Sequence, residues 1–403
     1  MHGPTPLWWA IDNGHEEVAR ILLERIDVDP NRADEYGRTP LSLAALHGYE
    51  RLVRILLERN DVDPPAADRA GRTPLWWAAQ KGHEGVVRIL LELGKVNPDT
   101  PDRDGLTLLS QAAQYGEEGV VRMLPEQNHA NHDTADYEGL TPLLRAARKG
   151  RVGVVRILLG RSDVNYNAAD RCGDTPLMLA AIYGRWEVVK ILLGRSDVNP
   201  NKENWRGQAT LSAAAECGHV GVVGLLLERS EVNPATADQY GQTPLSRAAR
   251  FGREGAVRIL PEQDEVNPDR TDQDGRTPLS RAARYGHDGV VRILLGREDV
   301  NPDTPDKCGR TPLFGAAHHN HKMVVRQLLG RDDVSSDIRD EYGQTPLLQA
   351  VQYGHERIAK LLQDHTNFTP GYAASLQPTG VFSPELPELP LPPLERTHRS
   401  NQE

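Results

Sequence analysis

A Thr-Pro-Leu triplet, or a one-residue variant of it, recurs every 34 residues along most of the chain. No insertion or deletion interrupts this register, so the chain is a tandem array of units of one length. Self-similarity at such a short period predicts identical supersecondary units stacked on one another, in place of a globule with one central core. The triplets begin at Thr5, Thr39, Thr73, Thr107, Thr141, Thr175, Ala209, Thr243, Thr277, Thr311 and Thr345.

The first half of each unit predicts a short helix that begins at the triplet and ends at a fixed position. In the third unit, Thr73 is suited to cap the helix N-terminus, and Pro74 to occupy its first position. Gly82 favours the left-handed conformation that ends a helix. Asn320 alone replaces glycine here, and asparagine tolerates this conformation better than most residues. The helix stops are Gly14, Gly48, Gly82, Gly116, Gly150, Gly184, Gly218, Gly252, Gly286, Asn320 and Gly354.

The second half of each unit predicts another helix and then an irregular finger. In the third unit, Val86, Val87, Leu90 and Leu91 recur at helical spacing toward one face. A Val-Asn-Pro or Val-Asp-Pro stretch follows and cannot continue a helix. An Asp-x-x-Gly sequence closes the unit, and its aspartate is expected to bond its own backbone and form a turn. An Ala-Ala pair in most first helices permits close stacking of neighbouring units.

This pattern resembles the ankyrin repeat, whose signature is D-x-x-G-x-T-P-L-x-x-A-A-x-x-G-H-x-x-V-V-x-x-L-L. The other 34-residue repeat, the tetratricopeptide type, lacks Thr-Pro-Leu. The resemblance covers residues 3–364 and implies an all-α solenoid of helix-turn-helix units with projecting finger loops. After residue 364 the periodicity ceases, and residues 365–403 contain a proline-rich acidic segment that predicts a disordered tail. The signature is clearest in the units that begin at Asp34, Asp68, Asp238, Asp272 and Asp306.

Composition and cysteine usage favour a cytoplasmic protein, with the nucleus as the alternative. No apolar stretch approaches the length that spans a bilayer, and the N-terminus lacks the features of an export signal, so no membrane partner is expected. The chain has three cysteines. Cys172 and Cys308 occupy equivalent positions four units apart, or about 40 Å at roughly 10 Å per layer, which rules out a disulfide between them.

The sequence contains no catalytic signature of the common enzyme classes. It has no GxxxxGK[ST] phosphate loop, no GxSxG elbow and no HExxH motif, so neither enzymatic activity nor a cofactor is expected. Histidines recur after the helix stops, but their spacing is too wide for a shared metal ion, and a structural hydrogen-bonding role is expected. The local cluster of His318, His319 and His321 lacks a carboxylate or thiol at ligand spacing, so no metal site is predicted there either.

The residues that vary between units predict where a partner binds. In ankyrin-like arrays the resemblance places recognition on the concave face, made by the finger tips and the two residues before each helix stop. Arginine and aromatic residues, which are enriched at interface hot spots, gather on this face in units five to nine. The expected partner-binding residues are Arg145, Arg148, Lys149, Tyr183, Arg247, Arg250, Phe251, Arg281, Arg284 and Tyr285.

Two interpretations of this basic and aromatic stripe remain open. In one, the arginines pair with the finger aspartates and contact no partner. In the other, an acidic segment of a partner protein lies along the stripe. The formal net charge of −10 opposes attraction of phosphates, so nucleic acid is not an expected partner.

The function predicted from these features is that of a non-enzymatic scaffold for protein–protein interaction. The alternative is the C-terminal ligand-sensing ankyrin region of a larger nucleotide-binding signalling receptor, which the absence of a finger in the first unit motivates.

Two local irregularities carry further expectations. Trp8 and Trp9 lie in the first unit, where no preceding unit covers them, so an exposed N-terminal edge is expected. Pro125 and Pro261 occupy equivalent positions in the second helices of units four and eight, and each is expected to end its helix about one turn early.

Overall fold

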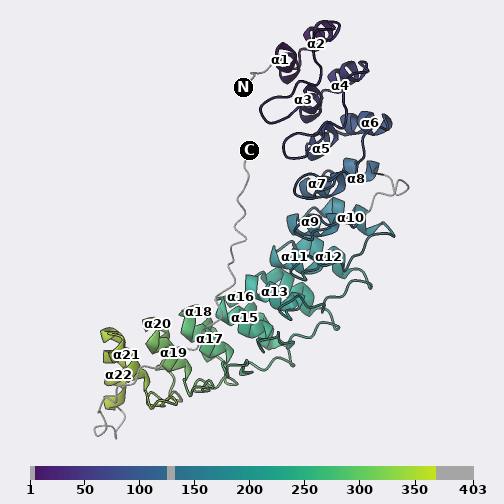
Figure 1. The fold of residues 1–403 in the computed structure, drawn as a ribbon. Coiled ribbons are helices and arrows are strands. Elements are labelled where there is room, and N and C mark those ends of the chain that lie inside the picture. Colours follow the sequence, from purple (N-terminus) through teal and green to yellow (C-terminus); the bar gives the residue numbers. More distant parts are fainter. Residues whose placement is uncertain (1–4, 125–131, 369–403) are drawn as a thin grey trace.

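The computed structural model describes residues 5–124 and 132–368 of the 403-residue chain. Its helices follow one another along a single curved stack that runs from α1 to α22 (Figure 1). First helices contact the first helices of neighbouring units, and second helices contact second helices. None of the described residues forms a strand. The predicted all-α solenoid is confirmed.

Each unit contributes one first helix and one second helix. The first helices are α1 (Pro6–Asp12), α3 (Pro40–His47), α5 (Pro74–Gln80), α7 (Leu108–Tyr115), α9 (Pro142–Lys149), α11 (Pro176–Ile182), α13 (Thr210–Cys217), α15 (Pro244–Arg250), α17 (Pro278–Tyr285), α19 (Pro312–His318) and α21 (Pro346–Gln352). The second helices are α2 (Glu16–Leu23), α4 (Glu50–Leu57), α6 (Glu84–Glu92), α8 (Glu118–Met123), α10 (Val152–Leu159), α12 (Trp186–Leu193), α14 (Val220–Leu227), α16 (Glu254–Ile259), α18 (Asp288–Leu295), α20 (Lys322–Leu328) and α22 (Glu356–Phe368).

The first helices begin and end where the sequence predicts. The threonine hydroxyl caps the helix in every unit but the seventh, as in Thr73, whose Oγ1 accepts from the Trp76 amide at 3.2 Å. In the seventh unit Ala209 replaces threonine and has no side-chain cap. The residue at each helix stop has a positive φ, and Asn320, with φ of 63°, is the one non-glycine with positive φ among the described residues. The predicted backbone requirement at this position is confirmed.

The core is continuous along the array and lies between the two rows of helices. It extends without a break from Leu7 in the first unit to Leu362 in the last. Ala78 and Ala79 of the Ala-Ala pair are fully buried, as expected for close stacking. Burial of each large aliphatic side chain contributes about 1.5–3 kcal/mol, so stability is distributed over all units.

A ladder of side chains after the helix stops joins the units in eight of the ten consecutive pairs. Nε2 of His83 donates to the carbonyl oxygen of Leu46, in the last turn of α3, at 3.0 Å. Carbonyls in a last helical turn have no partner within the helix, so this bond satisfies one of them. The expected hydrogen-bonding role is confirmed for five of the six histidines, all but His15, and arginine also fills it. The equivalent bonds are His219 to Ile182, His287 to Arg250, His321 to Arg284, His355 to His318, Arg151 to Gln114, Arg185 to Arg148 and Arg253 to Glu216.

A second ladder joins the second helices to one another. Nη1 of Arg59 donates to the carbonyl oxygen of Leu23, at the end of α2, at 2.9 Å. The same guanidinium is held by Asp61 through bonds of 2.8 and 2.5 Å. Arg195 and Arg331 repeat the arrangement, with Asp197 and Asp333 as their carboxylates and the ends of α10 and α18 as the helices that they join.

The fingers are tight turns closed by their aspartates. Oδ1 of Asp68 accepts from the backbone amides of Ala70 and Arg72 at 2.8 and 3.0 Å. The amide of Arg69 donates to the carbonyl oxygen of Tyr36 in the preceding finger at 3.0 Å, so consecutive fingers are joined. The expected turn-forming role of these aspartates is confirmed.

The helices before the two prolines are shortened as predicted. Helix α8 ends at Met123, before Pro125, which lies outside the described residues. Helix α16 ends at Ile259, and a 3₁₀ turn, η1 (Leu260–Glu262), carries Pro261. At the other end of the array, α22 continues past residue 364 to Phe368. The predicted disordered tail therefore lies, from residue 369 on, outside the described residues.

The N-terminal edge of the stack is apolar and exposed, as expected. Trp9 is 54% exposed, whereas Trp77, which occupies the same position within the array, is 9% exposed. Ile21 of the same first unit is 61% exposed. None of the described helices is both long and apolar enough to cross a membrane.

Candidate partner-binding surface

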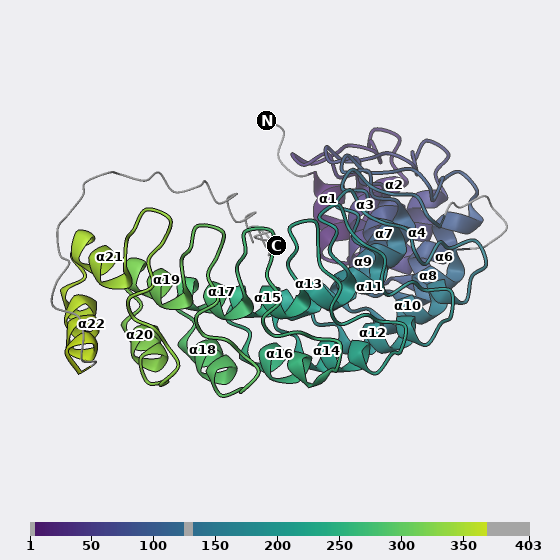
Figure 2. The same ribbon diagram turned by 90° about the horizontal axis from the view of Figure 1, so that it is seen from below.

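The ends of the first helices line one side of the stack next to the fingers. Figure 2 shows α13, α15, α17, α19 and α21 in a row, with the finger loops on one side and the second helices on the other. We call the two residues before each helix stop, from Asp12 and Asn13 to Gln352 and Tyr353, the helix-end row. Seven of the ten predicted partner-binding residues lie in this row, and the other three lie one helical turn earlier.

Side-chain contacts between neighbouring units join parts of the helix-end row. The Arg148 guanidinium lies over the Tyr183 ring, 5.6 Å from its centroid. The His318 and Tyr353 rings meet edge to face with centroids 4.5 Å apart. In both cases a residue two before one stop contacts the residue directly before the next stop. Further contacts of this kind are Asp12 with His47 at 3.1 Å and Gln80 with Tyr115 at 3.1 Å.

Three of the predicted arginines, one helical turn earlier, form ion pairs with the fingers, and their side chains are buried or largely buried. Nε of Arg247 donates to Oδ2 of Asp238 at 2.9 Å, and its Nη1 donates to Glu216 at 2.9 Å. The side chains of Arg247 and Asp238 are 5% and 0% exposed. Pairing with finger aspartates, one of the two interpretations that the sequence leaves open, is observed for these three arginines. The other two pairs are Arg145 with Asp136 at 2.6 Å and Arg281 with Asp272 at 2.8 Å.

Arg250 has a different environment, although it lies on the same helix face as Arg247. Its guanidinium lies 5.7 Å from the centroid of the Phe251 ring and 5.5 Å from that of Tyr285. Its Nε is buried and has no hydrogen-bond partner within the described part of the chain. Stacking on aromatic rings stabilises a guanidinium without neutralising it. Arg250 therefore presents a positive charge held in place by two rings.

A group of positive charges surrounds Lys149 at the end of α9. Burial lowers the pKa of the Lys149 ammonium, and the guanidinium charges of Arg148, Arg145, Arg151 and Arg185 lower it further. Arg148 is 9% exposed and contacts the exposed carboxylate of Glu138 at 3.3 Å. The sequence prediction missed Arg151 and Arg185, which come from positions after the helix stops. Their signal was the replacement of histidine by arginine at those positions.

The structure also brings together three potential metal ligands that the sequence prediction did not single out. One ligand atom from each of Asp170, Cys172 and Asp174 lies within 4.8 Å of the others, and no histidine of the predicted His318 cluster belongs to such a group in the described ranges. Both carboxylates have partners. Oδ1 of Asp170 accepts from the amides of Cys172 and Asp174, and Oδ1 of Asp174 accepts from Asn204 at 2.9 Å. These contacts are those of a finger turn.

A family model described as ankyrin repeats (3 copies) matches the chain in overlapping segments that together extend from residue 2 to residue 370. The chain belongs to the ankyrin-repeat family. No curated protein matched it in a separate comparison. The matched ankyrin-repeat segments are residues 2–68, 60–136, 93–170, 125–204, 161–237, 194–272, 211–306 and 298–370.

Membership of the ankyrin-repeat family gives the helix-end row a general meaning. Ankyrin repeats are, as a rule, modules for protein–protein interaction, and the family is typically non-enzymatic. Shared family membership does not identify the partner, since one fold hosts many functions.

Proposed function

We propose that this ankyrin-repeat array is a non-enzymatic scaffold that binds an acidic segment of a partner protein along the helix-end row and the fingers. The observation that carries the proposal is the environment of Arg250. The Arg250 guanidinium lies against the rings of Phe251 and Tyr285 and forms no ion pair with a carboxylate in the described part of the chain, so it is a preformed donor for a carboxylate of a partner. Arginine and tyrosine dominate interface hot spots, and both are present here.

The distribution of charge supports the same proposal. The whole chain has a formal net charge of −10, yet the helix-end row contains Arg148, Lys149, Arg250 and Arg284, and its acidic residues are Asp12 and Glu216 alone. A local positive surface on an acidic protein attracts acidic segments while the overall charge disfavours phosphate-rich polymers. The buried pairs of Arg145, Arg247 and Arg281 hold the fingers against the first helices and contribute by keeping the surface rigid.

A capture experiment with matched variants tests this function. The full chain and the variants R250E, R284E and R258E are used to capture proteins from a lysate, and the captured proteins are identified by mass spectrometry. Arg258 lies on second helix α16 in an exposed pair with Glu254 at 2.8 Å, so R258E makes the same charge change away from the row.

We expect R250E and R284E to lose proteins that the wild type and R258E retain, and we expect capture to weaken with salt because exposed charge pairs are screened. Identical capture by all four proteins at all salt concentrations would contradict the proposal. The alternative, a ligand-sensing region of a larger receptor, stays a prediction that rests on the sequence alone.

A further inference from the structure

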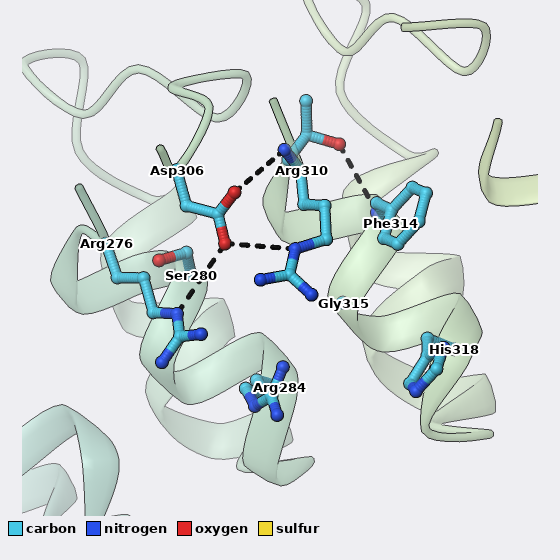
Figure 3. Close-up of a pocket in the computed structure, with 9 residues that line it drawn as sticks. Arg276, Ser280, Arg284, Asp306, Arg310, Phe314, Gly315 and His318 are labelled. Carbon is cyan, nitrogen blue, oxygen red and sulfur yellow. Dashed lines mark hydrogen bonds and ion pairs between the residues drawn. The ribbon is translucent and has the colours of Figure 1, made fainter. Parts of the chain in front are cut away.

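A small hollow opens in the finger-side surface between units nine and ten. Its volume is about 20 Å³, which is room for about one water molecule. Figure 3 shows the guanidinium groups of Arg276 and Arg310 on either side of Asp306, with Arg284 and His318 further along the helix ends. The lining residues are Arg276, Ser280, Arg284, Asp306, Arg310, Thr311, Phe314, Gly315 and His318.

The hollow exists because Gly315 has no side chain. Gly315 occupies the position of Arg247 in unit eight and Arg281 in unit nine, and no other unit has glycine there. A Cβ atom built on Gly315 would be 3.7 Å from its nearest neighbour, Cβ of Arg284, which is ordinary van der Waals contact. The space that a long side chain fills in units eight and nine is therefore empty in unit ten.

The lining of the hollow has more positive than negative charge. Three guanidinium groups face one carboxylate, Asp306. Both oxygens of the Asp306 carboxylate have partners. Oδ1 accepts from the amides of Cys308 and Arg310. Oδ2 lies 3.2 Å from Nε of Arg310 and 3.6 Å from Nε of Arg276. The two Nη groups of Arg310 have no hydrogen-bond partner in the described part of the chain, since Nε makes the one side-chain bond of this residue.

We propose that this hollow binds one carboxylate, from a glutamate or aspartate side chain of the bound partner segment, with the Nη groups of Arg310 as donors. This inference rests on the proposed function, because it places one anchor of the acidic segment. The hollow can take no more than one oxygen of a carboxylate, whose other atoms would lie at its mouth, and its volume is too small for a nucleotide or another metabolite. Arginine presents paired donors that match a carboxylate, so the chemistry favours this occupant.

Unit nine suggests the variant that tests the proposal. There, Arg281 binds Asp272, and Arg276, the equivalent of Arg310, turns instead to Asp274 at 3.2 Å and to Asp306 of the next finger. The substitution G315R gives unit ten the same residues as unit nine at the positions of Asp272, Arg276 and Arg281. The new side chain is expected to fill the hollow and bind Asp306, as Arg281 binds Asp272. A second variant, R310Q, removes the proposed donor without filling the hollow.

The experiment measures binding of a fluorescein-labelled hexaglutamate peptide to the full chain by fluorescence anisotropy, with a hexaglutamine peptide as the control. We expect G315R and R310Q each to weaken hexaglutamate binding about tenfold, the usual effect of losing a charge-assisted hydrogen bond. G315R adds a positive charge, so a peptide held only by overall charge would bind G315R more tightly than the wild type. Such a result would overturn the proposal.

Two further measurements, with the R250E variant and with inorganic phosphate, distinguish failure of this inference from failure of the proposed function. If R250E loses hexaglutamate binding while G315R and R310Q bind as the wild type does, the proposed function stands and the hollow is not an anchor. If R250E also binds as the wild type does, or the wild type does not bind, both proposals fail. If inorganic phosphate displaces the peptide from the wild type but not from G315R, the hollow is a general anion site, and the assignment to a partner carboxylate is wrong.

Discussion

Asp303 accepts a hydrogen bond through Oδ2 from the backbone amide of Ser335, in the next unit, at 2.7 Å. Its Oδ1 is buried and has no hydrogen-bond partner within the described residues. At the equivalent positions, Asn31, Asn167 and Asn201 each use their side-chain nitrogen to donate to a carbonyl oxygen 30 residues further on. An aspartate in this place has no such donor unless it is protonated.

We expect D303N to stabilise the array at neutral pH by about 1 kcal/mol, because the amide completes a hydrogen bond that the carboxylate cannot make. Burial raises the pKa of the Asp303 carboxyl, and the charges of Asp333 and Asp337 raise it further. Because the carboxyl pKa is higher in the folded state than in the unfolded state, protonation of Asp303 favours folding. This contribution to the free energy of unfolding is complete below the unfolded pKa of 3.8 and is lost as the pH rises through the folded pKa.

The advantage of D303N in urea unfolding should therefore be largest near neutral pH and shrink toward pH 4. The reciprocal change N201D should lower stability at neutral pH by a similar amount, because Asn201 donates to the Glu231 carbonyl oxygen at 2.6 Å. A pH-independent effect of either substitution would show that the carboxyl does not titrate in this window.

R247M is expected to destabilise the array by about 3–5 kcal/mol. Removal of the guanidinium leaves Asp238 buried and Glu216 largely buried, both without their partner, and uncompensated buried charges are costly. R258M, which breaks the exposed pair with Glu254, should cost less than about 1 kcal/mol. Thermal melting and urea unfolding give both values, and equal stabilities would mean that the Arg247 ion pair does not hold the finger.

H287A should lower stability by about 1 kcal/mol, since it leaves the carbonyl oxygen of Arg250 without its bond from the next unit. H287R should restore most of the loss, because Arg253 makes the equivalent bond to Glu216 at 2.8 Å. Hydrogen exchange of the amides around Gly252 locates the effect. Failure of arginine to rescue would show that the ring, rather than its hydrogen bond, matters at this joint.

W9A should reduce self-association of the full chain and leave its stability within about 0.5 kcal/mol, because Trp9 is exposed on the uncovered first unit. W77A removes an equivalent but buried ring and should cost about 3–5 kcal/mol. Light scattering measures the association, and urea unfolding measures the stability. Unchanged scattering for W9A would mean that another part of the chain causes any association.

The sequence predicts most of the fold because each unit repeats the same local signals. Thr73 and Gly82 set the bounds of a first helix through hydrogen bonding and backbone conformation, which depend on near neighbours alone. Asn320 ends its helix with a positive φ as glycine does in the other units, so the requirement at this position is the left-handed conformation and not glycine itself. Pro261 likewise shortens α16 by removing a donor within its own helix.

The roles of individual residues in and next to the helix-end row were harder to predict. Arg247 and Arg250 lie on the same helix face at a spacing of three residues, so periodicity treats them alike. The finger determines the difference between them, because Asp238 is placed within reach of Arg247 by a turn whose position in space the sequence does not reveal. The hollow beside Gly315 also escaped prediction, since it depends on the directions of Arg276 and Arg310.

The ladder of histidines and arginines after the helix stops has a consequence for how recognition can change. These side chains bond to backbone carbonyls, and those carbonyls stay in place whatever side chain the same residue carries. The spacing of the helix-end row is thus fixed by the backbone, whereas the side chain at each of its positions can be exchanged. A partner segment bound as proposed has to match the spacing of the units, and a new specificity requires only new side chains at positions that are already in place.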